Sequence, residues 1–361
     1  MKRSELKIGL ALSGGGIRAA IYHLGVLKYL AENNLLEQVT HISSVSGASM
    51  CVGLLYAKNN MRFPTSSEYL TTILPTLKDQ ILNVNLEQKA IIEAIFKFKF
   101  NKKANAIALA LAKHWGINGG FGDISKKPLW SVVCTSYETG KHFRFSQDIV
   151  GDWAFGYIKD SNFPLADAIA ASAAFPFLIG TYEIDTKPFE WCDKSGAKIE
   201  PKSDKLHLWD GGVYDNFGLE PIYQMENNGM YSDDVNFCIL SNAGKSISFQ
   251  SKKTVTRIVD VTTDQISILR ARAFRDFIFR NKNGYYLKMG RDFSEVVRRA
   301  KQDMSLADKY KNDFLSEEDC QKVANYPTTL KNPTEQDFDL ILRQGYESII
   351  YNKLVFDFIE P

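Results

Sequence analysis

The sequence has few cysteines, no paired cysteine motif and no long apolar run. Its five cysteines stand singly, so we expect neither a disulfide framework nor a cysteine-bound zinc site. The apolar run Ala106 to Ala112 is too short to cross a bilayer, and no other stretch does better. Met1 to Leu6 has no apolar region or cleavage site typical of a signal peptide. These absences predict a reduced, cytoplasmic protein.

The chain also lacks a strong charge of either sign. Its formal net charge is +2 over 361 residues, and no nucleic-acid-binding motif stands out, so we expect no nucleic-acid partner. Hydrophobic residues make up 45% and charged residues 24% of the chain, which is ordinary globular composition with ample material for a core. We expect one large domain, or one domain with an appendage.

The first informative segment is a glycine-rich turn between a strand and a helix. Residues 7–12 are typical of a short buried strand, and residues 19–31 carry apolar side chains at helical spacing. Between them lies Ser13-Gly14-Gly15-Gly16-Ile17-Arg18. Three glycines let the backbone approach a ligand, and free N–H groups at a helix N-terminus bind negative charge.

A serine occupies the next turn of the same kind. Residues 39–45 predict a second strand and residues 47–56 a second helix, with Ser46 at the junction. A serine on a sharp strand-to-helix turn is the nucleophile-elbow arrangement. Its hydroxyl needs a base and donors for the oxyanion that forms. The N–H groups of Gly14, Gly15 and Gly16 are the candidate oxyanion hole, and Arg18 is expected to orient that loop or to balance nearby charge.

The base must come from elsewhere, and Asp210 is the best candidate. It follows a short predicted strand and precedes Gly211-Gly212, which let the turn swing its carboxylate toward a neighbouring loop. The rest of the chain predicts helices over much of 64–118, a hairpin from strands 131–137 and 141–146, a helix at 165–174, strands at 206–209 and 235–240, and a long helix at 264–281. Strands interleaved with helices predict a three-layer α/β/α architecture.

At this point the chain resembles the patatin-like phospholipase family. The matching residues are Gly14-Gly15-Gly16-Ile17-Arg18, Ser46 within Ser44-Val45-Ser46-Gly47-Ala48-Ser49, Ala170-Ala171-Ser172-Ala173-Ala174-Phe175-Pro176, and Asp210-Gly211-Gly212 with Asp215-Asn216-Phe217-Gly218 after it. Each motif alone is weak, whereas four in this order are strong. For Asp215 and Asn216 we prefer loop capping to catalysis.

The resemblance implies a patatin-like sandwich with a helical C-terminal addition. It implies a catalytic domain over residues 7–245 and a C-terminal helical extension over residues 246–361 packed on the same domain. It also implies acyl-ester hydrolysis on phospholipids or other lipids by a Ser–Asp dyad, here Ser46 and Asp210. The oxyanion donors would come from Gly14, Gly15 and Gly16, and no metal or other cofactor is implied.

The elbow departs from the family's usual Gly-x-Ser-x-Gly, because Ser44 and Ala48 occupy the two glycine positions. Both residues are small, so a tight turn stays feasible. The departure leaves Ser49 as a rival nucleophile, although it would lie inside the helix. We favour Ser46.

Two other interpretations of these motifs are weaker. Gly14, Gly16 and Ala19 fit a dinucleotide-binding turn, but no acidic residue ends the second strand, and no Gly-Lys-Ser/Thr follows for a P-loop. A serine–histidine triad is available as Ser46 with Asp123 and His142, or with Asp148 and His207. His142 is expected on an exposed strand face, and His207 on the opposite strand face from Asp210.

The segment Phe96 to Lys103 alternates aromatic and basic residues. Such a segment can seat a protein peripherally on an anionic membrane surface; a core-packed helix pair with solvated lysines is the alternative, and the alternation at 96–100 also suits a strand. Two further functions stay open. One is a phospholipase effector gated by a small molecule or protein, by resemblance to cyclic-dinucleotide-activated antiphage enzymes, and the other is a lipid-binding protein with little turnover.

Overall fold

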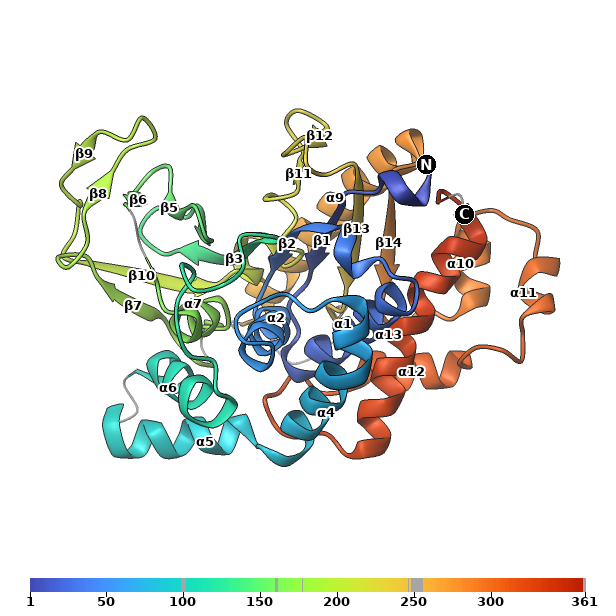
Figure 1. Cartoon of the computed structure of the whole chain (residues 1–361), viewed down its shortest axis with the longest axis horizontal. Coiled ribbons are helices and arrows are strands. Elements are labelled where there is room, and N and C mark those ends of the chain that lie inside the picture. The colour runs from blue at the N-terminus through green and yellow to red at the C-terminus, as the bar shows by residue number, and fades with distance from the viewer. Residues whose placement is uncertain (99–101, 160–161, 177, 246, 248–255, 360–361) are drawn as a thin grey trace.

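The structure, a computed structural model, describes residues 1–98, 102–159, 162–176, 178–245, 247 and 256–359. Within these ranges one large mixed sheet of twelve strands lies between layers of helices (Figure 1). Its strands are β1 (Ile8–Leu12), β2 (Val39–Ser44), β3 (Leu129–Ser136), β4 (His142–Phe145), β5 (Val150–Asp152), β6 (Gly156–Ile158), β7 (Tyr182–Asp185), β8 (Trp191–Cys192), β9 (Lys198–Ile199), β10 (Lys205–Asp210), β13 (Phe237–Asn242) and β14 (Gly284–Lys288). A separate short ribbon pairs β11 (Tyr223–Gln224) with β12 (Gly229–Met230).

The helices fall between and after these strands. The larger ones are α1 (Gly16–Glu32), α2 (Gly47–Lys58), α4 (Leu74–Asn83), α5 (Leu86–Glu93), α6 (Lys103–Trp115), α7 (Leu165–Ser172), α9 (Thr256–Asn281), α10 (Phe293–Arg299), α12 (Glu317–Asn325) and α13 (Glu335–Phe356). The short ones are α3 (Ser66–Glu68), α8 (Gly212–Asp215) and α11 (Ser305–Lys309), the π-helical turns η3 (Tyr69–Ile73) and η4 (Ala94–Phe98), and the 3₁₀ turns η1 (Arg3–Glu5) and η2 (Leu36–Gln38).

The parallel half of the sheet has the order β14-β13-β1-β2-β3. All five residues of β1 are buried, as expected for a parallel strand covered on both faces. Leu12, the last residue of β1, pairs with Ser44 of β2 and Ser241 of β13. Because parallel strands end at one edge, the turns after β1 and β2 are brought together there.

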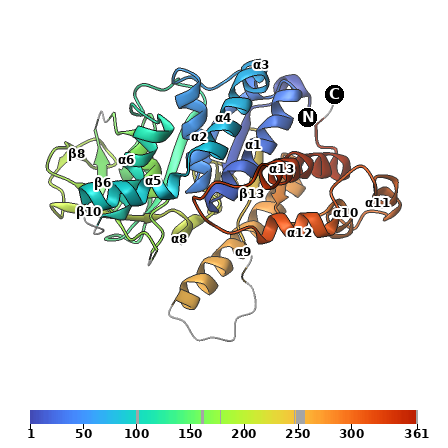
Figure 2. The same cartoon turned by 90° about the horizontal axis from the view of Figure 1, so that it is seen from below.

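Two cores cover the two faces of the sheet. The larger core joins the strands to helices on one side, including α1, α2 and α13, and the second joins residues of β13 and β14 to α9. Figure 2 shows α8 and α9 on the opposite side of the sheet from α1 and α2. The chain therefore forms the predicted three-layer α/β/α sandwich.

The antiparallel half positions the last predicted site residue. Strand β10 pairs antiparallel with β3, so that Asp210 lies opposite Cys134. Beyond β3 the hairpin partner β4 continues into β5, β6, β8 and β9. The end of β10 is thereby held beside the turn that follows β2.

Most predicted elements are confirmed, with differences at their ends. The hairpin of β3 and β4 and the strand before Asp210 are present. Helix α9 begins at Thr256 rather than at residue 264; its first turns are rich in β-branched residues, which weaken the helical signal in the sequence. The strand considered for residues 96–100 is wrong where the structure describes it, because η4 is π-helical through Phe98, and residues 99–101 lie outside the described residues.

The C-terminal region has a helical part, as predicted, and it also contributes a strand. Strand β14 extends the sheet beside β13, and α13 packs along α1. The boundary at residue 245 stays a prediction. Residues 284–288 were not predicted as a strand because a five-residue edge element between two helical patterns gives little periodicity.

Candidate active site

Ser46 lies at the turn between β2 and α2 in a strained backbone conformation. Its φ is 53° and its ψ −117°, a region that non-glycine residues rarely adopt and that surrounding structure must enforce. The Ser46 N–H donates to Ser172 Oγ over 2.9 Å, and Ser172 Oγ donates to the Val133 carbonyl over 2.7 Å. The turn is therefore fixed to α7 and β3, and Ser46 lines a cavity of about 390 Å³.

The turn that carries Ser46 is tightly packed, and this packing requires small residues around it. A Cβ on Gly47 would lie 1.9 Å from the Gly16 carbonyl oxygen, so α2 and the glycine turn meet backbone to backbone. Ser44 is buried and accepts a hydrogen bond from Trp130 Nε1 over 2.8 Å. Ser49 is also buried, shares a hydrogen bond with Ser44 Oγ over 2.9 Å and does not line the cavity. The geometry favours Ser46 over Ser49 as the reactive hydroxyl.

The glycine turn presents two backbone donors. Gly15 and Gly16 have φ values of 150° and 64°, which only glycine adopts without strain. The Gly14 N–H donates to the Asn216 carbonyl over 3.1 Å, so it is already occupied. The N–H groups of Gly15 and Gly16 have no acceptor within the described part of the chain, and both residues line the cavity. Of the three predicted donors, these two are available to a ligand.

The Arg18 side chain links the helix that follows the glycine turn to distant parts of the chain. Its guanidinium is buried and donates to three carbonyl oxygens: Ala324 (2.9 Å), Tyr326 (2.7 Å) and Ala243 (3.2 Å). Burial lowers the pKa of Arg18 to about 10. With these bonds Arg18 ties the start of α1 to the end of α12 and to the segments that follow β13 and α12. Its role in orienting the glycine turn stays a prediction.

Asp210 lies in the same cavity as Ser46 and is 5% exposed. Its N–H donates to the Ala174 carbonyl over 2.9 Å, and its Oδ1 accepts the Gly212 N–H over 2.7 Å. Burial raises the pKa of Asp210 to about 7, against the smaller lowering effects of the Gly212 N–H and of the Ser46 side chain. No basic side chain forms an ion pair with it among the described residues. A carboxylate in this state is suited to accept a proton near neutral pH.

The neighbouring acid Asp215 has a structural role. It is fully buried, and its carboxylate accepts the N–H groups of Phe217 (3.1 Å) and Leu219 (2.6 Å). It caps the loop, as we preferred. Asn216 contributes more than predicted: its side chain lines the cavity, and Cβ atoms on Gly14 and Gly212 would lie 2.7 and 2.8 Å from its Oδ1. The signal for Asn216 was its position in the familial motif.

The histidines lie outside this cavity in the described structure. His207 Nδ1 lies 2.6 Å from Glu138 Oε1, and burial lowers the pKa of His142. Asp148 accepts the Ser146 hydroxyl over 2.6 Å, and Asp123 the Gly120 N–H over 2.8 Å. The structure therefore brings neither predicted triad together. Ser172, whose hydroxyl contacts the turn at Ser46, was not singled out from the sequence as a site residue. The signal that could have found it was its place in the familial motif of residues 170–176.

Among the described residues, no group of three or more His, Cys, Asp or Glu side chains is arranged to hold a metal ion. No helix among them has the length and apolarity needed to cross a bilayer.

Fold and site together define a class, the three-layer α/β proteins with a serine on a nucleophile elbow. The family model of patatin-like phospholipase matches residues 10–223. This match covers more than half of the chain, and the protein belongs to the patatin-like phospholipase family.

Individual relatives match over a short segment. The chain is 51% identical over 47 residues to cytosolic phospholipase A2 gamma of Mus musculus, which is 13% of this chain and 8% of that protein. The Homo sapiens protein of the same name is 45% identical over 47 residues, 13% of this chain and 9% of that protein. The chain thus matches less than a tenth of the length of these relatives.

Solved structures show the same fold over nearly the whole chain. Human GIVD cytosolic phospholipase A2 has a TM-score of 0.53 and 14% identity, covering 96% of this chain and 58% of that chain. The same human protein in complex with methyl gamma-linolenyl fluorophosphonate has a TM-score of 0.52 and 14% identity, covering 98% and 58%. At 14% identity, this similarity shows a shared fold and nothing further.

Proposed function

We propose that this protein is a serine lipid acyl hydrolase of the phospholipase A type, acting through a Ser46–Asp210 dyad. The observation that carries the proposal is that a buried carboxylate with a raised pKa lines the same cavity as a serine in a strained backbone conformation. The family supports the same substrate class, and so do the names of the relatives described above, which are cytosolic phospholipases A2.

Each of these residues has a role in the proposed acyl transfer. Ser46 Oγ attacks the ester carbonyl, and its proton passes to Asp210. The N–H groups of Gly15 and Gly16 donate to the oxyanion, while Gly14 and Arg18 hold the turn in place. The carbonyl re-forms as the leaving alcohol departs with the proton from Asp210. A water then attacks the acyl-enzyme, giving its proton to Asp210, and the fatty acid leaves as Ser46 regains its hydrogen.

Docking on a lipid surface is proposed for the region around α5 and η4. Phe96 is 82% exposed, and Ile91, Ile92 and Ile95 are exposed beside it. The side chains of residues 97–98, and residues 99–101, lie outside the described residues. Lys103 Nζ donates to the carbonyl of Leu178 over 3.3 Å, and Leu178, itself 69% exposed, lines the catalytic cavity.

These exposed apolar side chains and the contact of Lys103 with Leu178 support a docking surface in this region. Apolar side chains of this kind enter a membrane interface, and adjacent lysines are attracted to anionic head groups. The proposed location is therefore cytoplasmic with peripheral contact to a membrane.

Release of fatty acid from phospholipid vesicles tests the proposed function. The wild-type protein should release fatty acid, and Ser46→Ala should reduce the rate on the order of 10⁶-fold while the fold is kept. Ser49→Ala is the matched control, since it removes a hydroxyl one helical turn away, and it should keep most of the activity.

Two results would contradict the assignment. Activity retained in Ser46→Ala but lost in Ser49→Ala would show that the nucleophile is Ser49. Vesicle binding by the wild-type protein without any hydrolysis would indicate a lipid-binding protein of the same fold.

A further inference from the structure

A second group of cavities adjoins the catalytic cavity and is strongly basic. One of about 380 Å³ shares Asn242, Phe217 and Lys288 with the catalytic cavity. It is continuous with another of about 270 Å³, since both are lined by Lys288, Arg291 and Arg299. We call the two together the basic cavity. Volumes of this size suit a small-molecule ligand rather than a single ion.

The basic cavity carries more positive than negative charge. Six cations line it, from the segment after β13, from α9, from β14 and from α10: Lys245, Arg272, Arg275, Lys288, Arg291 and Arg299. Two carboxylates, Asp264 and Glu295, face them. Glu295 pairs with Arg299 over 2.6 Å and with Arg291 over 3.5 Å.

The remaining cations form no ion pair with a carboxylate in the part of the chain that the structure describes. Lys288 is half-buried, and its Nζ donates to the Gly244 carbonyl over 2.7 Å; burial and the nearby Arg291 and Arg18 lower its pKa to about 8. Among the described residues no ion pair involves Lys288, Arg272 or Arg275. Gathering unpaired cations in a hollow is electrostatically unfavourable unless an anion occupies it.

The guanidinium groups are also held in place by an aromatic ring. Arg275 and Arg291 both stack on Tyr286, at 5.7 and 5.6 Å from the ring centroid. The Tyr286 hydroxyl accepts a hydrogen bond from Asn242 Nδ2 over 2.9 Å, and Asn242 borders the catalytic cavity. Fixed arginines of this kind bind phosphate oxygens in a bidentate manner.

We propose that the basic cavity binds the phosphoryl groups of an anionic ligand beside the catalytic cavity. Two sources share this chemistry. One is the head group of an anionic phospholipid whose ester lies at Ser46, and the other is a soluble molecule with phosphate groups. The proposal concerns binding, so it can be tested whether or not the proposed hydrolysis is correct.

Titration calorimetry with inorganic pyrophosphate and the full chain tests this site. We expect saturable binding that weakens on the order of 10- to 100-fold in the double variant Arg275→Gln/Arg299→Gln, which keeps side-chain size but removes two charges. Arg298→Gln is the matched control, because Arg298 is an exposed arginine of α10 that does not line the basic cavity, and its binding should match wild type. Thermal melting shows whether each variant is folded. If the double variant is unfolded, Arg272→Gln replaces it, because Arg272 is an exposed residue that also lines the basic cavity.

Enzyme assays with wild-type protein then distinguish the two sources. If pyrophosphate slows hydrolysis of anionic vesicles alone, the phosphoryl group belongs to the lipid head group. If it also changes kcat on a small soluble ester, the ligand is a soluble molecule. The absence of saturable pyrophosphate binding, or an equal loss in Arg298→Gln and the double variant, would overturn the proposal even if Ser46 proves to be the nucleophile.

Discussion

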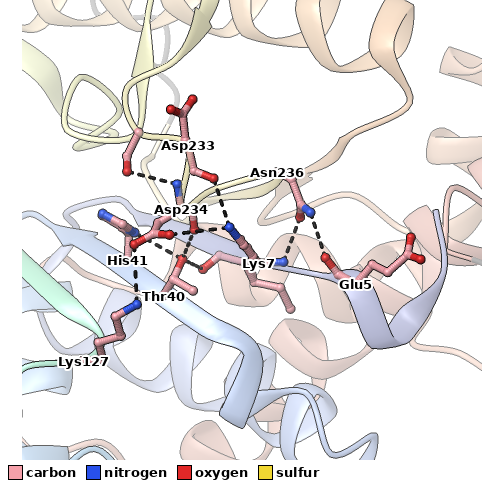
Figure 3. Close-up of polar contacts among 10 residues, drawn as sticks. Glu5, Lys7, Thr40, His41, Lys127, Asp233, Asp234 and Asn236 are labelled. Atoms are coloured by element: carbon pink, nitrogen blue, oxygen red, sulfur yellow. Dashed lines mark hydrogen bonds and ion pairs between the residues drawn. The ribbon is translucent and has the colours of Figure 1, made fainter.

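Two aspartates near opposite ends of the sheet show how differently one side chain can be used. Asp234 precedes β13 at the edge where β1 and β2 begin, and Figure 3 shows it among Lys7, Thr40 and Lys127. Its carboxylate lies 3.5 Å from Lys7 Nζ and 3.4 Å from Lys127 Nζ, and its side chain is half exposed. Asp210 ends β10 near the other edge, buried and without a cationic partner among the described residues.

The surroundings move the two pKa values in opposite directions. Lys127 and Lys7 lower the pKa of Asp234, whereas burial raises the pKa of Asp210 to about 7. Asp234 therefore stays ionised and joins strand ends, while Asp210 can gain and lose a proton near neutral pH. Polar clustering alone therefore does not single out a candidate site. A buried carboxylate beside a strained serine, with no ion-pair partner among the described residues, does so.

Replacing the carboxylate of Asp210 is expected to have the largest effect of the tests that compare Asp210 with Asp234. Asp210→Asn should lower hydrolysis of a soluble ester on the order of 10⁴-fold or more, since no other base contacts Ser46 in the proposed dyad. Steady-state kinetics measure this loss. His207→Ala is the control and should cost less than about tenfold; a loss above about 10³-fold there would indicate a triad instead.

The same substitution should stabilise the protein, with a defined pH dependence. The native pKa of Asp210 lies above its ordinary value of 3.8, so the native state binds more protons than the unfolded chain between about pH 4 and 7, and stability falls as pH rises through that window. Asp210→Asn removes this cost. Its free energy of unfolding should exceed wild type on the order of 4 kcal/mol above pH 7, and the gain should vanish below about pH 4.

Urea unfolding at a series of pH values measures this gain. The central comparison fails if Asp210→Asn is less stable than wild type at pH 8, because Asp210 would then act as Asp234 does, as an ionised structural group.

The next largest effect is expected at Gly47, where the turn that carries Ser46 packs against the glycine turn. Gly47→Ala would place a Cβ against the Gly16 carbonyl oxygen and should lower the free energy of unfolding by about 1–3 kcal/mol, together with activity, since both turns must move. Denaturant unfolding and ester kinetics report the two losses. Gly229→Ala, which would meet only Asn227 O at 3.7 Å, should change neither.

Docking should depend on the exposed patch and leave the dyad untouched. Phe96→Ala should weaken binding to anionic vesicles on the order of tenfold, because it removes an aromatic ring that would enter the interface. Hydrolysis of a soluble ester should be unchanged. Vesicle sedimentation measures binding, with Trp153→Ala as an exposed aromatic control outside the cavity lining; equal losses in both variants would assign docking elsewhere.

The smallest effect is expected at Asp234. Asp234→Asn removes exposed ion pairs, which contribute little to stability. It should lower the melting temperature slightly near neutral pH, opposite in sign to Asp210→Asn, and the difference should disappear as pH falls through the lowered pKa of Asp234. Activity should not change, and a marked loss would mean that the opposite edge supports catalysis.

The sequence predicts the parts of this protein that depend on local pattern. The β1–α1–β2–α2 run, the hairpin of β3 and β4, and the order of Ser46 and Asp210 follow from periodicity and turn residues. Strand β14 does not, because its place depends on pairing with a distant strand. The occupied N–H of Gly14 and the support from Ser172 depend on contacts between segments far apart in the chain.

The basic cavity shows the same limit. Arg272 and Arg275 lie on one helix, and from the sequence alone this helix is interpreted first as a packing helix with a basic face. Only folding brings them beside Lys288 and Arg299 of β14 and α10. Unpaired charge is a property of the assembled structure, so no pattern along one segment could reveal it.

The pH dependence of labelling by a fluorophosphonate tests the Ser46–Asp210 dyad most directly. The wild-type protein should be labelled at Ser46, located by peptide mapping, with a rate that rises through an apparent pKa near 7 as Asp210 ionises. In Asp210→Asn the rate should be low at every pH and lack that rise. Rapid labelling of Ser46 with the same pH profile in Asp210→Asn would contradict the account.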